Sequence, residues 1–91
     1  MVTDIDLRRK EIRFRARRGL KEIDLLLQAF LNQQLEALSA QELIELCALL
    51  QCYDQDLLAW CIEGKPCPTA YAPLVQRLRQ QAQALWREVP T

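Results

Sequence analysis

Apolar residues recur at intervals of three and four along the middle of this 91-residue chain, and this spacing constrains its fold more than any other feature. The residues that carry the pattern are Leu20, Ile23, Leu27, Phe30, Leu31, Leu35 and Leu38. Such a period places apolar side chains on one face of a long amphipathic helix, which must bury that face against other elements. The alternation typical of β-strands does not occur over a useful length. The sequence therefore predicts an all-α fold.

Local signals predict further helices on both sides of this one. Residues 4–18 contain neither glycine nor proline and are rich in helix-favouring residues. Ser39 and Glu42 have the spacing of a capping box, in which each side chain accepts from the backbone N–H of the other, and this predicts the start of a third helix. Asp54 is expected to cap a short fourth helix, which Gly64 ends.

The last third of the chain begins with prolines and ends with another apolar helical pattern. Pro66, Pro68 and Pro73 predict an irregular connection, so the fifth helix is expected to begin between residues 69 and 73. Short joints between helices predict a small bundle of about five helices. A chain of this length is enough for one helical domain, covering residues 1–91, and too short for two.

Basic residues are concentrated at the beginning of the chain. Eight basic and five acidic residues lie in residues 1–24, against four basic and seven acidic residues in the remainder, although the net charge is zero. This asymmetry is compatible with a nucleic-acid arm, with a patch for an acidic protein partner, or with a solvated helix face. No zinc-finger or RNP-type aromatic motif supports nucleic acid, and no nucleic-acid partner is expected.

The chain has four cysteines and no histidine, which limits its chemistry. Cys47, Cys52, Cys61 and Cys67 match no common zinc spacing, so reduced and partly buried thiols are expected, with no metal. Without histidine there is no His-dependent nucleophile or base, and no other catalytic constellation is present, so the protein is not expected to be an enzyme. No apolar run approaches the roughly 20 residues of a membrane span. Without a secretory signal, a cytoplasmic protein with no membrane insertion is expected, and a mature organellar form stays open as the alternative.

Gly19 lies at the joint between the first two predicted helices. It can end the first helix in the left-handed conformation, while Glu22 falls in the first turn of the next helix, where a negative charge is favourable. By itself, an Arg-Gly-x-x-Glu string at such a joint is more often a helix cap with a solvated ion pair than a binding site.

Further motifs follow this joint in a recognisable order. They are Arg17-Arg18-Gly19-Leu20-Lys21-Glu22-Ile23-Asp24, Phe30-Leu31, Leu38-Ser39, Leu49-Leu50-Gln51-Cys52, Asp54-x-Asp56-Leu57-x-x-Trp60 and Gly64-Lys65-Pro66. From about residue 12 to residue 66 the chain resembles the SdhE family of flavoprotein assembly factors, also called succinate dehydrogenase assembly factor 2. It departs from the family's usual Asp-Pro-Asp run by having Gln55 in the middle, which is expected to weaken the start of the fourth helix slightly.

The resemblance implies a non-catalytic assembly factor that binds the flavoprotein subunit of succinate dehydrogenase, or of the related fumarate reductase. It implies that the factor promotes covalent attachment of FAD to that subunit, and no cofactor is expected to be bound stably by the factor itself. The partner-binding residues carried over are Arg17, Arg18, Gly19 and Glu22, and possible further contacts are Asp54, Asp56 and Trp60.

Three questions stay open at this point. Trp60 is compatible with a place in the core as well as with an anchor for a partner. Glu22 can either accept from the partner or hold the neighbouring arginine in place. For the chain as a whole, the main competitor is a helical nucleic-acid-binding or regulatory module that uses the arginine-rich first helix.

Overall fold

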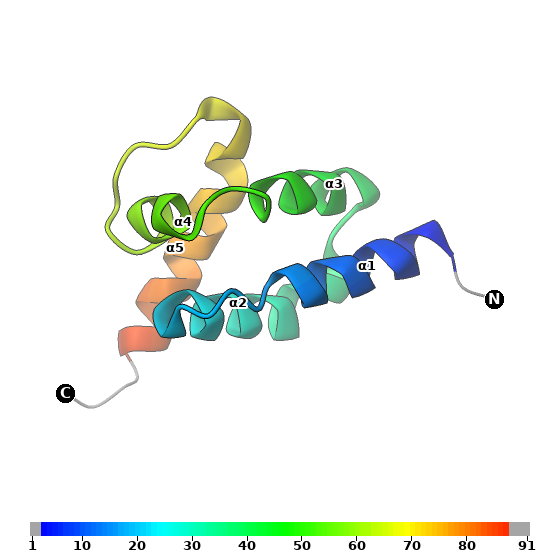
Figure 1. Cartoon of the computed structure of the whole chain (residues 1–91), viewed down its shortest axis with the longest axis horizontal. Helices are drawn as coiled ribbons and strands as arrows, with labels where there is room; N and C mark the ends of the chain where they lie inside the picture. The colour runs from blue at the N-terminus through cyan, green and yellow to red at the C-terminus, as the bar shows by residue number, and fades with distance from the viewer. Residues whose placement is uncertain (1–2, 88–91) are drawn as a thin grey trace.

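The protein is described by a computed structural model that covers residues 3–87. Its helices are α1 (Asp4–Arg15), α2 (Lys21–Gln34), α3 (Ala40–Leu49), α4 (Asp54–Cys61) and α5 (Ala72–Arg87), with single 3₁₀ turns η1 (Leu35–Ala37) and η2 (Thr69–Tyr71) (Figure 1). No strand occurs in this part of the chain. The all-α prediction is confirmed, and the fifth helix begins in the predicted window.

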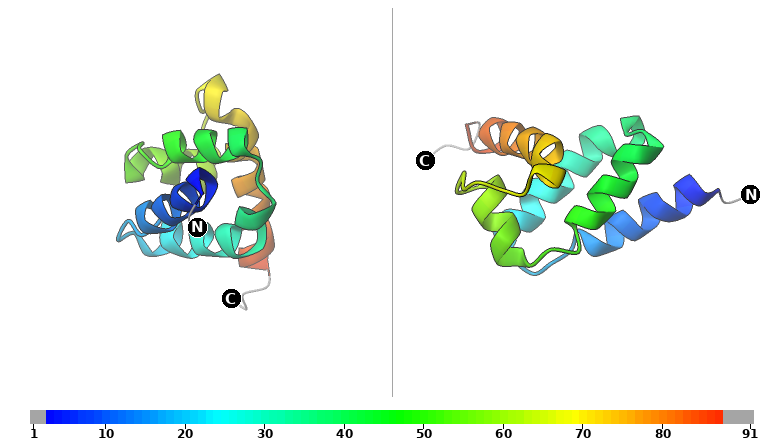
Figure 2. Two further views of the ribbon diagram at one scale, coloured as in Figure 1. Left: turned by 90° about the vertical axis from the view of Figure 1, so that its right-hand side faces the viewer. Right: turned by 90° about the horizontal axis from the view of Figure 1, so that it is seen from above.

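The helices pack as crossing pairs around one apolar core. Helix α1 lies along α3, and α5 packs across both α2 and α4 (Figures 1 and 2). The molecule is elongated, measuring 46 × 28 × 22 Å, with the start of α1 and the end of α5 toward opposite ends of its long axis. Every buried side chain in the described range is hydrophobic. The apolar set that predicted the second helix is buried, except that Leu20 is only partly so.

Capping side chains fix the start of two helices. Ser39 Oγ accepts from the N–H of Glu42 at 3.1 Å, and the Glu42 carboxylate accepts from the N–H of Ser39 at 2.9 Å, so the predicted capping box is confirmed. Thr3 and Asp6 form a second capping box at the start of α1, which the sequence analysis did not identify.

Two predicted helix boundaries differ from the structure. The first helix ends at Arg15 rather than at residue 18, because the chain turns away into the joint that contains Gly19. The prediction that Asp54 caps α4 is wrong: Tyr53 occupies the N-cap position and makes no side-chain cap, and Asp54 is the first helical residue. The Asp54 carboxylate is instead bound to an arginine of the joint.

Candidate protein-binding site

Gly19 lies in the open joint between α1 and α2. Its φ of +90° confirms the predicted left-handed conformation, which strains any residue with a β-carbon. A β-carbon at this position would meet no atom within 4 Å. The backbone conformation, rather than crowding inside the chain, therefore accounts for the glycine, and the joint presents bare backbone to the solvent.

Asp24 holds this joint from the first turn of α2. One carboxylate oxygen accepts from the backbone N–H of Arg18 at 2.8 Å, and the other accepts from the backbone N–H of Gly19 at 3.1 Å. A single side chain thus satisfies two consecutive backbone donors of the irregular segment. The sequence analysis assigned no role to Asp24, which is no N-cap because it lies inside the first turn of α2 and bonds to residues before the helix.

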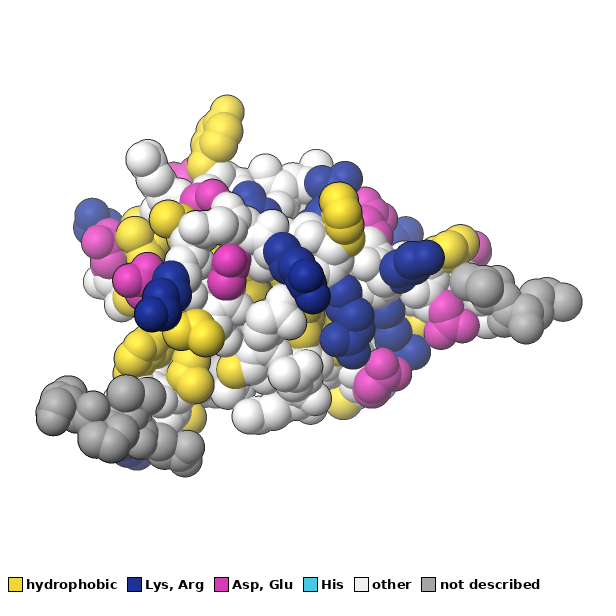
Figure 3. All heavy atoms as spheres, turned by 60° about the horizontal axis from the view of Figure 1, so that its bottom comes forward, with side chains coloured by type: hydrophobic (Ala, Val, Ile, Leu, Met, Phe, Trp, Pro, Cys, Tyr) yellow, Lys and Arg dark blue, Asp and Glu magenta, His cyan; other side chains and the backbone are white. Residues whose placement is uncertain are grey.

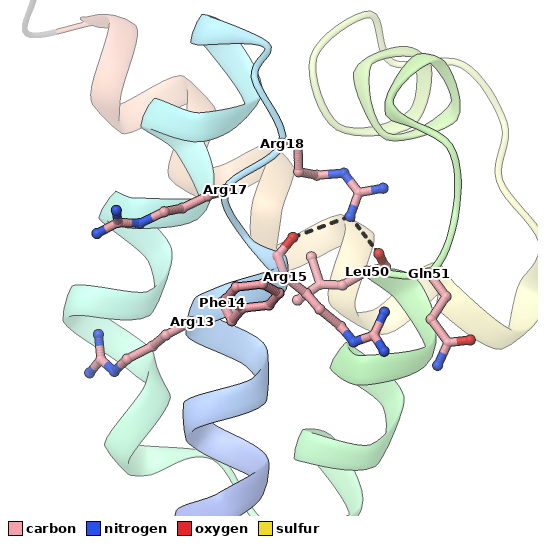
Figure 4. A pocket seen from close by; sticks show the side chains of 7 residues that line it. All are labelled: Arg13, Phe14, Arg15, Arg17, Arg18, Leu50 and Gln51. Carbon is pink, nitrogen blue, oxygen red and sulfur yellow. Dashed lines mark hydrogen bonds between the residues drawn. The ribbon is translucent and has the colours of Figure 1, made fainter.

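The side chain of Arg18 braces the joint from the side of α3 and α4, whereas Asp24 holds it from α2. Its Nε donates to the Asp54 carboxylate. Its two terminal nitrogens donate to the backbone carbonyls of Leu50, Cys52 and Arg15. Only 15% of the side chain is exposed. The planar guanidinium, with donors pointing in several fixed directions, ties the α1–α2 joint to the loop between α3 and α4 (Figure 4).

The residues of the Arg-Gly-x-x-Glu motif therefore divide into an inward and an outward group. Arg18 points inward and its donors are occupied. Arg17 and Glu22 are exposed, and within residues 3–87 neither side chain makes a hydrogen bond or an ion pair. One of the two roles considered for Glu22 was to hold the neighbouring arginine in place. In the structure Asp54, and not Glu22, holds Arg18. The role of these residues in binding a partner stays a prediction.

The other possible contact residues are placed differently from one another. Asp54 lies at the joint through its bond to Arg18, and Asp56 is half-buried two positions beyond it in α4. Trp60 packs partly buried against the core, and its ring stacks on Tyr71 with 5.8 Å between the ring centroids. The structure thus brings Asp54 into the site and packs Trp60 against the η2 segment.

An open hollow of about 780 Å³ lies beside the joint (Figure 4). It is lined by Arg13, Phe14, Arg15, Arg17, Arg18, Leu50 and Gln51. The space-filling view shows lysine and arginine side chains gathered on the half of the molecule that contains α1 (Figure 3). The hollow thus carries the positive charge that the sequence places at the beginning of the chain.

Among residues 3–87, the cysteine thiols take no part in the hydrogen bonds that brace the joint. All four are free thiols, and Cys47 and Cys61 are buried. Burial raises the pKa of the Cys61 thiol to about 12, so this thiol stays protonated near neutral pH. Between residues 3 and 87, no three His, Cys, Asp or Glu side chains come together as a metal site, and no helix is long and apolar enough to cross a membrane. Metal binding itself stays untested.

The described residues thus form a small helical bundle with an exposed, braced joint between α1 and α2. Residues 10–82 match the protein family described as the flavinator of succinate dehydrogenase. The FAD assembly factor SdhE of Haemophilus ducreyi is 32% identical over 80 residues, covering 87% of this chain and 98% of the relative. The SdhE of Shewanella oneidensis is 33% identical over 72 residues, covering 78% of this chain and 88% of the relative.

A mitochondrial relative is similar over most of the chain. The mitochondrial succinate dehydrogenase assembly factor 2 of Yarrowia lipolytica is 33% identical over 92 residues, covering 94% of this chain and 63% of the relative. No solved structure matches significantly. The chain belongs to the family of succinate dehydrogenase flavinators, which includes the SdhE assembly factors.

Proposed function

We propose that this protein binds the flavoprotein subunit of succinate dehydrogenase, or of fumarate reductase, and promotes covalent attachment of FAD to that subunit. The observation that carries the proposal is the braced joint, in which Arg18 and Asp24 fix the backbone around Gly19, while Gly19 and Glu22 are exposed. Family membership supports it, because the family is described by this activity.

The proposal assigns each outward feature of the joint one role. Gly19 lets the backbone of the partner approach closely, because no side chain projects from it. Glu22 accepts charge-assisted hydrogen bonds from the partner, and Arg17 donates them. Arg18 and Asp24 act as positioning residues. Since they fix the joint before binding, less conformational entropy is lost when the complex forms.

In this proposal the chemistry remains in the flavoprotein. The chain has no histidine, so it supplies neither a histidine for flavin attachment nor a His-dependent base. FAD is held by the flavoprotein and is not bound stably by this chain. The factor favours the reactive conformation of its cytoplasmic partner to the extent that it binds that conformation more tightly than the others.

Glu22 provides the experiment that tests the proposal. Glu22→Gln removes the charge and keeps the size, whereas Glu22→Ala removes both. Because an exposed first-turn carboxylate contributes only about 0.3 to 1 kcal/mol to a helix, both variants should remain folded. We expect both to lower the yield of covalently flavinylated partner in cells lacking the native factor, with Glu22→Ala the lower.

The readout is the in-gel flavin fluorescence of the denatured flavoprotein subunit, normalised to its amount. Glu63→Gln is the matched control, because Glu63 is also an exposed glutamate but lies beyond the end of α4. It should give the wild-type yield. Wild-type fluorescence with both Glu22 variants at matched expression would reduce Glu22 to a helix-start residue.

A further inference from the structure

Two exposed aromatic side chains flank the braced joint. Phe14 is 80% exposed and Tyr53 is 81% exposed, and they are the two most exposed large hydrophobic residues between residues 3 and 87. The other exposed large hydrophobic residues in this range are only 41% to 55% exposed. Single exposed apolar residues are ordinary, but the two extreme cases here both lie next to the same functional segment.

Each aromatic residue lines its own hollow, and each hollow is also lined by a chain neighbour of Gly19. Phe14 lines the hollow that includes Arg18. Tyr53 lines a second hollow of about 430 Å³, together with Leu20, Asp54 and Gln55. Arg18 and Leu20 are the chain neighbours of Gly19, so both hollows lie next to the segment that carries this glycine.

The brace that holds the joint also fixes both aromatic positions. Phe14 belongs to the last turn of α1, whose following residues are tied down by Arg18 and Asp24. Tyr53 directly precedes Asp54, which accepts from Arg18, and directly follows Cys52, whose carbonyl also accepts from Arg18. Both aromatic residues are therefore attached to backbone that is ordered before any partner arrives.

Neither ring contributes to the core of the free protein. The hydrogen bonds of both residues involve only the backbone: Phe14 O accepts from the N–H of Arg17, and Tyr53 O accepts from the N–H groups of Asp56 and Leu57. Aromatic side chains that become buried on association dominate the energy of many protein interfaces. These two rings are placed to gain that energy without a change in the fold.

The charges around Phe14 indicate what faces it. A terminal guanidinium nitrogen of Arg13 lies 3.9 Å from a carboxylate oxygen of Glu36, and Nε of Arg15 lies 2.9 Å from one of Glu11. Arg17 forms no ion pair among residues 3–87. This arrangement is positive but interrupted by carboxylates, whereas nucleic acid needs a continuous track of cations. An acidic protein surface fits better, because a few carboxylates can pair with the arginines around one buried ring.

We propose that Phe14 and Tyr53 are paired anchors on either side of Gly19, which dock a folded protein offering an apolar recess to each ring and acidic side chains to Arg13 and Arg17. The inference rests on the proposed function, in which that protein is the flavoprotein subunit. It extends the binding surface from the motif at the joint to the end of α1 and the start of α4.

The test is a titration of the purified flavoprotein subunit with the full chain, measuring the dissociation constant by calorimetry. The anchor variants are Phe14→Ala, Tyr53→Ala and the double variant. The matched controls are Leu7→Ala and Ile44→Ala, which remove exposed apolar side chains outside both hollows. Each anchor variant should weaken binding about tenfold or more, and the double variant further, while the controls stay within about twofold. Circular dichroism should show all five variants folded.

A Gly19→Arg variant separates failure of this inference from failure of the proposed function. If the wild type binds and Gly19→Arg does not, while the anchor variants bind like the controls, the anchors are overturned and the proposed function stands. If the wild type does not bind the flavoprotein, both fail. Binding of the wild type to single-stranded RNA that the anchor variants lose would overturn the inference in favour of nucleic acid. Self-association lost in the anchor variants, measured by sedimentation, would overturn it in favour of a second copy.

Discussion

Two arginines in this bundle each make several contacts, but they stabilise different kinds of structure. Arg77 of α5 donates to Glu42 at 2.6 Å and to Gln34 at 2.9 Å, and its guanidinium lies 5.6 Å from the centre of the Phe30 ring. These partners are side chains on helices that already have their own hydrogen bonds and buried faces. Arg18 donates mainly to backbone carbonyls of irregular segments.

The difference determines what each arginine controls. Without Arg77, Ser39 and Glu42 still form the capping box of α3. We therefore expect the helices to keep their packing. Without Arg18, the carbonyls of Leu50 and Cys52 lose a donor, and among residues 3–87 no other side chain of α1 or of the joint bonds to the α3–α4 loop. We infer that Arg77 adds to the stability of the bundle, whereas Arg18 sets the shape of the proposed binding surface.

The largest effect is expected from removing Arg18. Arg18→Ala leaves a carboxylate and three carbonyls without this donor, which should lower the free energy of unfolding by about 2 to 4 kcal/mol. Arg18→Ala should also reduce flavinylation of the partner. Arg18→Lys should not restore it, because an ammonium group cannot reproduce the planar fork of the guanidinium. Arg77→Ala should cost only about 1 to 2 kcal/mol and leave flavinylation of the partner intact.

Urea unfolding gives the stabilities, and in-gel flavin fluorescence gives the yield of flavinylated partner. The contrast between the two arginines would be removed if Arg77→Ala reduced flavinylation as much as Arg18→Ala at equal amounts of folded protein.

The two glycines allow strain to be separated from contact. Gly19 and Gly64 both have positive φ, +90° and +73°, and a β-carbon would meet no atom within 4 Å at either position. Arginine at either position should cost roughly 1 to 2 kcal/mol of backbone strain. Gly19→Arg and Gly64→Arg should therefore lower the melting temperature similarly, while only Gly19→Arg abolishes binding of the flavoprotein. Equal loss of binding in both variants would indicate that strain, rather than position, is responsible.

A smaller effect on stability is expected when acid protonates Glu42, the carboxylate that pairs with Arg77. Hydrogen bonds from the backbone and hydroxyl of Ser39, followed by the charge of Arg77, hold the pKa of Glu42 below its ordinary value of 4.5. A lowered pKa in the folded state gives a stabilisation that is present above pH 4.5 and is lost as the pH falls through the lowered value. The stability difference between wild type and Glu42→Gln should therefore shrink below pH 4.5 in thermal unfolding. A difference that persists unchanged into strong acid would contradict this assignment.

The sequence predicted the regular part of the molecule better than the site. Ser39 with Glu42, and Gly19 with its left-handed backbone, are local signals that need only a few neighbouring residues, and both predictions are confirmed. Thr3 with Asp6 is an equally local signal that was available in the sequence. Periodic leucines located the core because helical spacing alone decides which face is buried.

The inward direction of Arg18 was not predictable in the same way. Its partners lie 32 to 36 residues further along the chain, apart from Arg15, and most of them are backbone carbonyls. A carbonyl is present at every residue, so no residue type indicates which one an arginine will reach. The sequence likewise favoured a local capping role for Asp54, because it does not show that Arg18 comes close. In the structure the Asp54 carboxylate binds Arg18 instead.

Hydrogen–deuterium exchange of the full chain, with and without the purified flavoprotein subunit, tests the central claim most directly because it compares the two ends of the bundle in one measurement. If the braced joint is the binding surface, amides in residues 12–24 and 50–57 should exchange more slowly in the complex, while those in residues 72–87 keep their free rates. Protection confined to residues 72–87 in a complex of known occupancy would contradict the account.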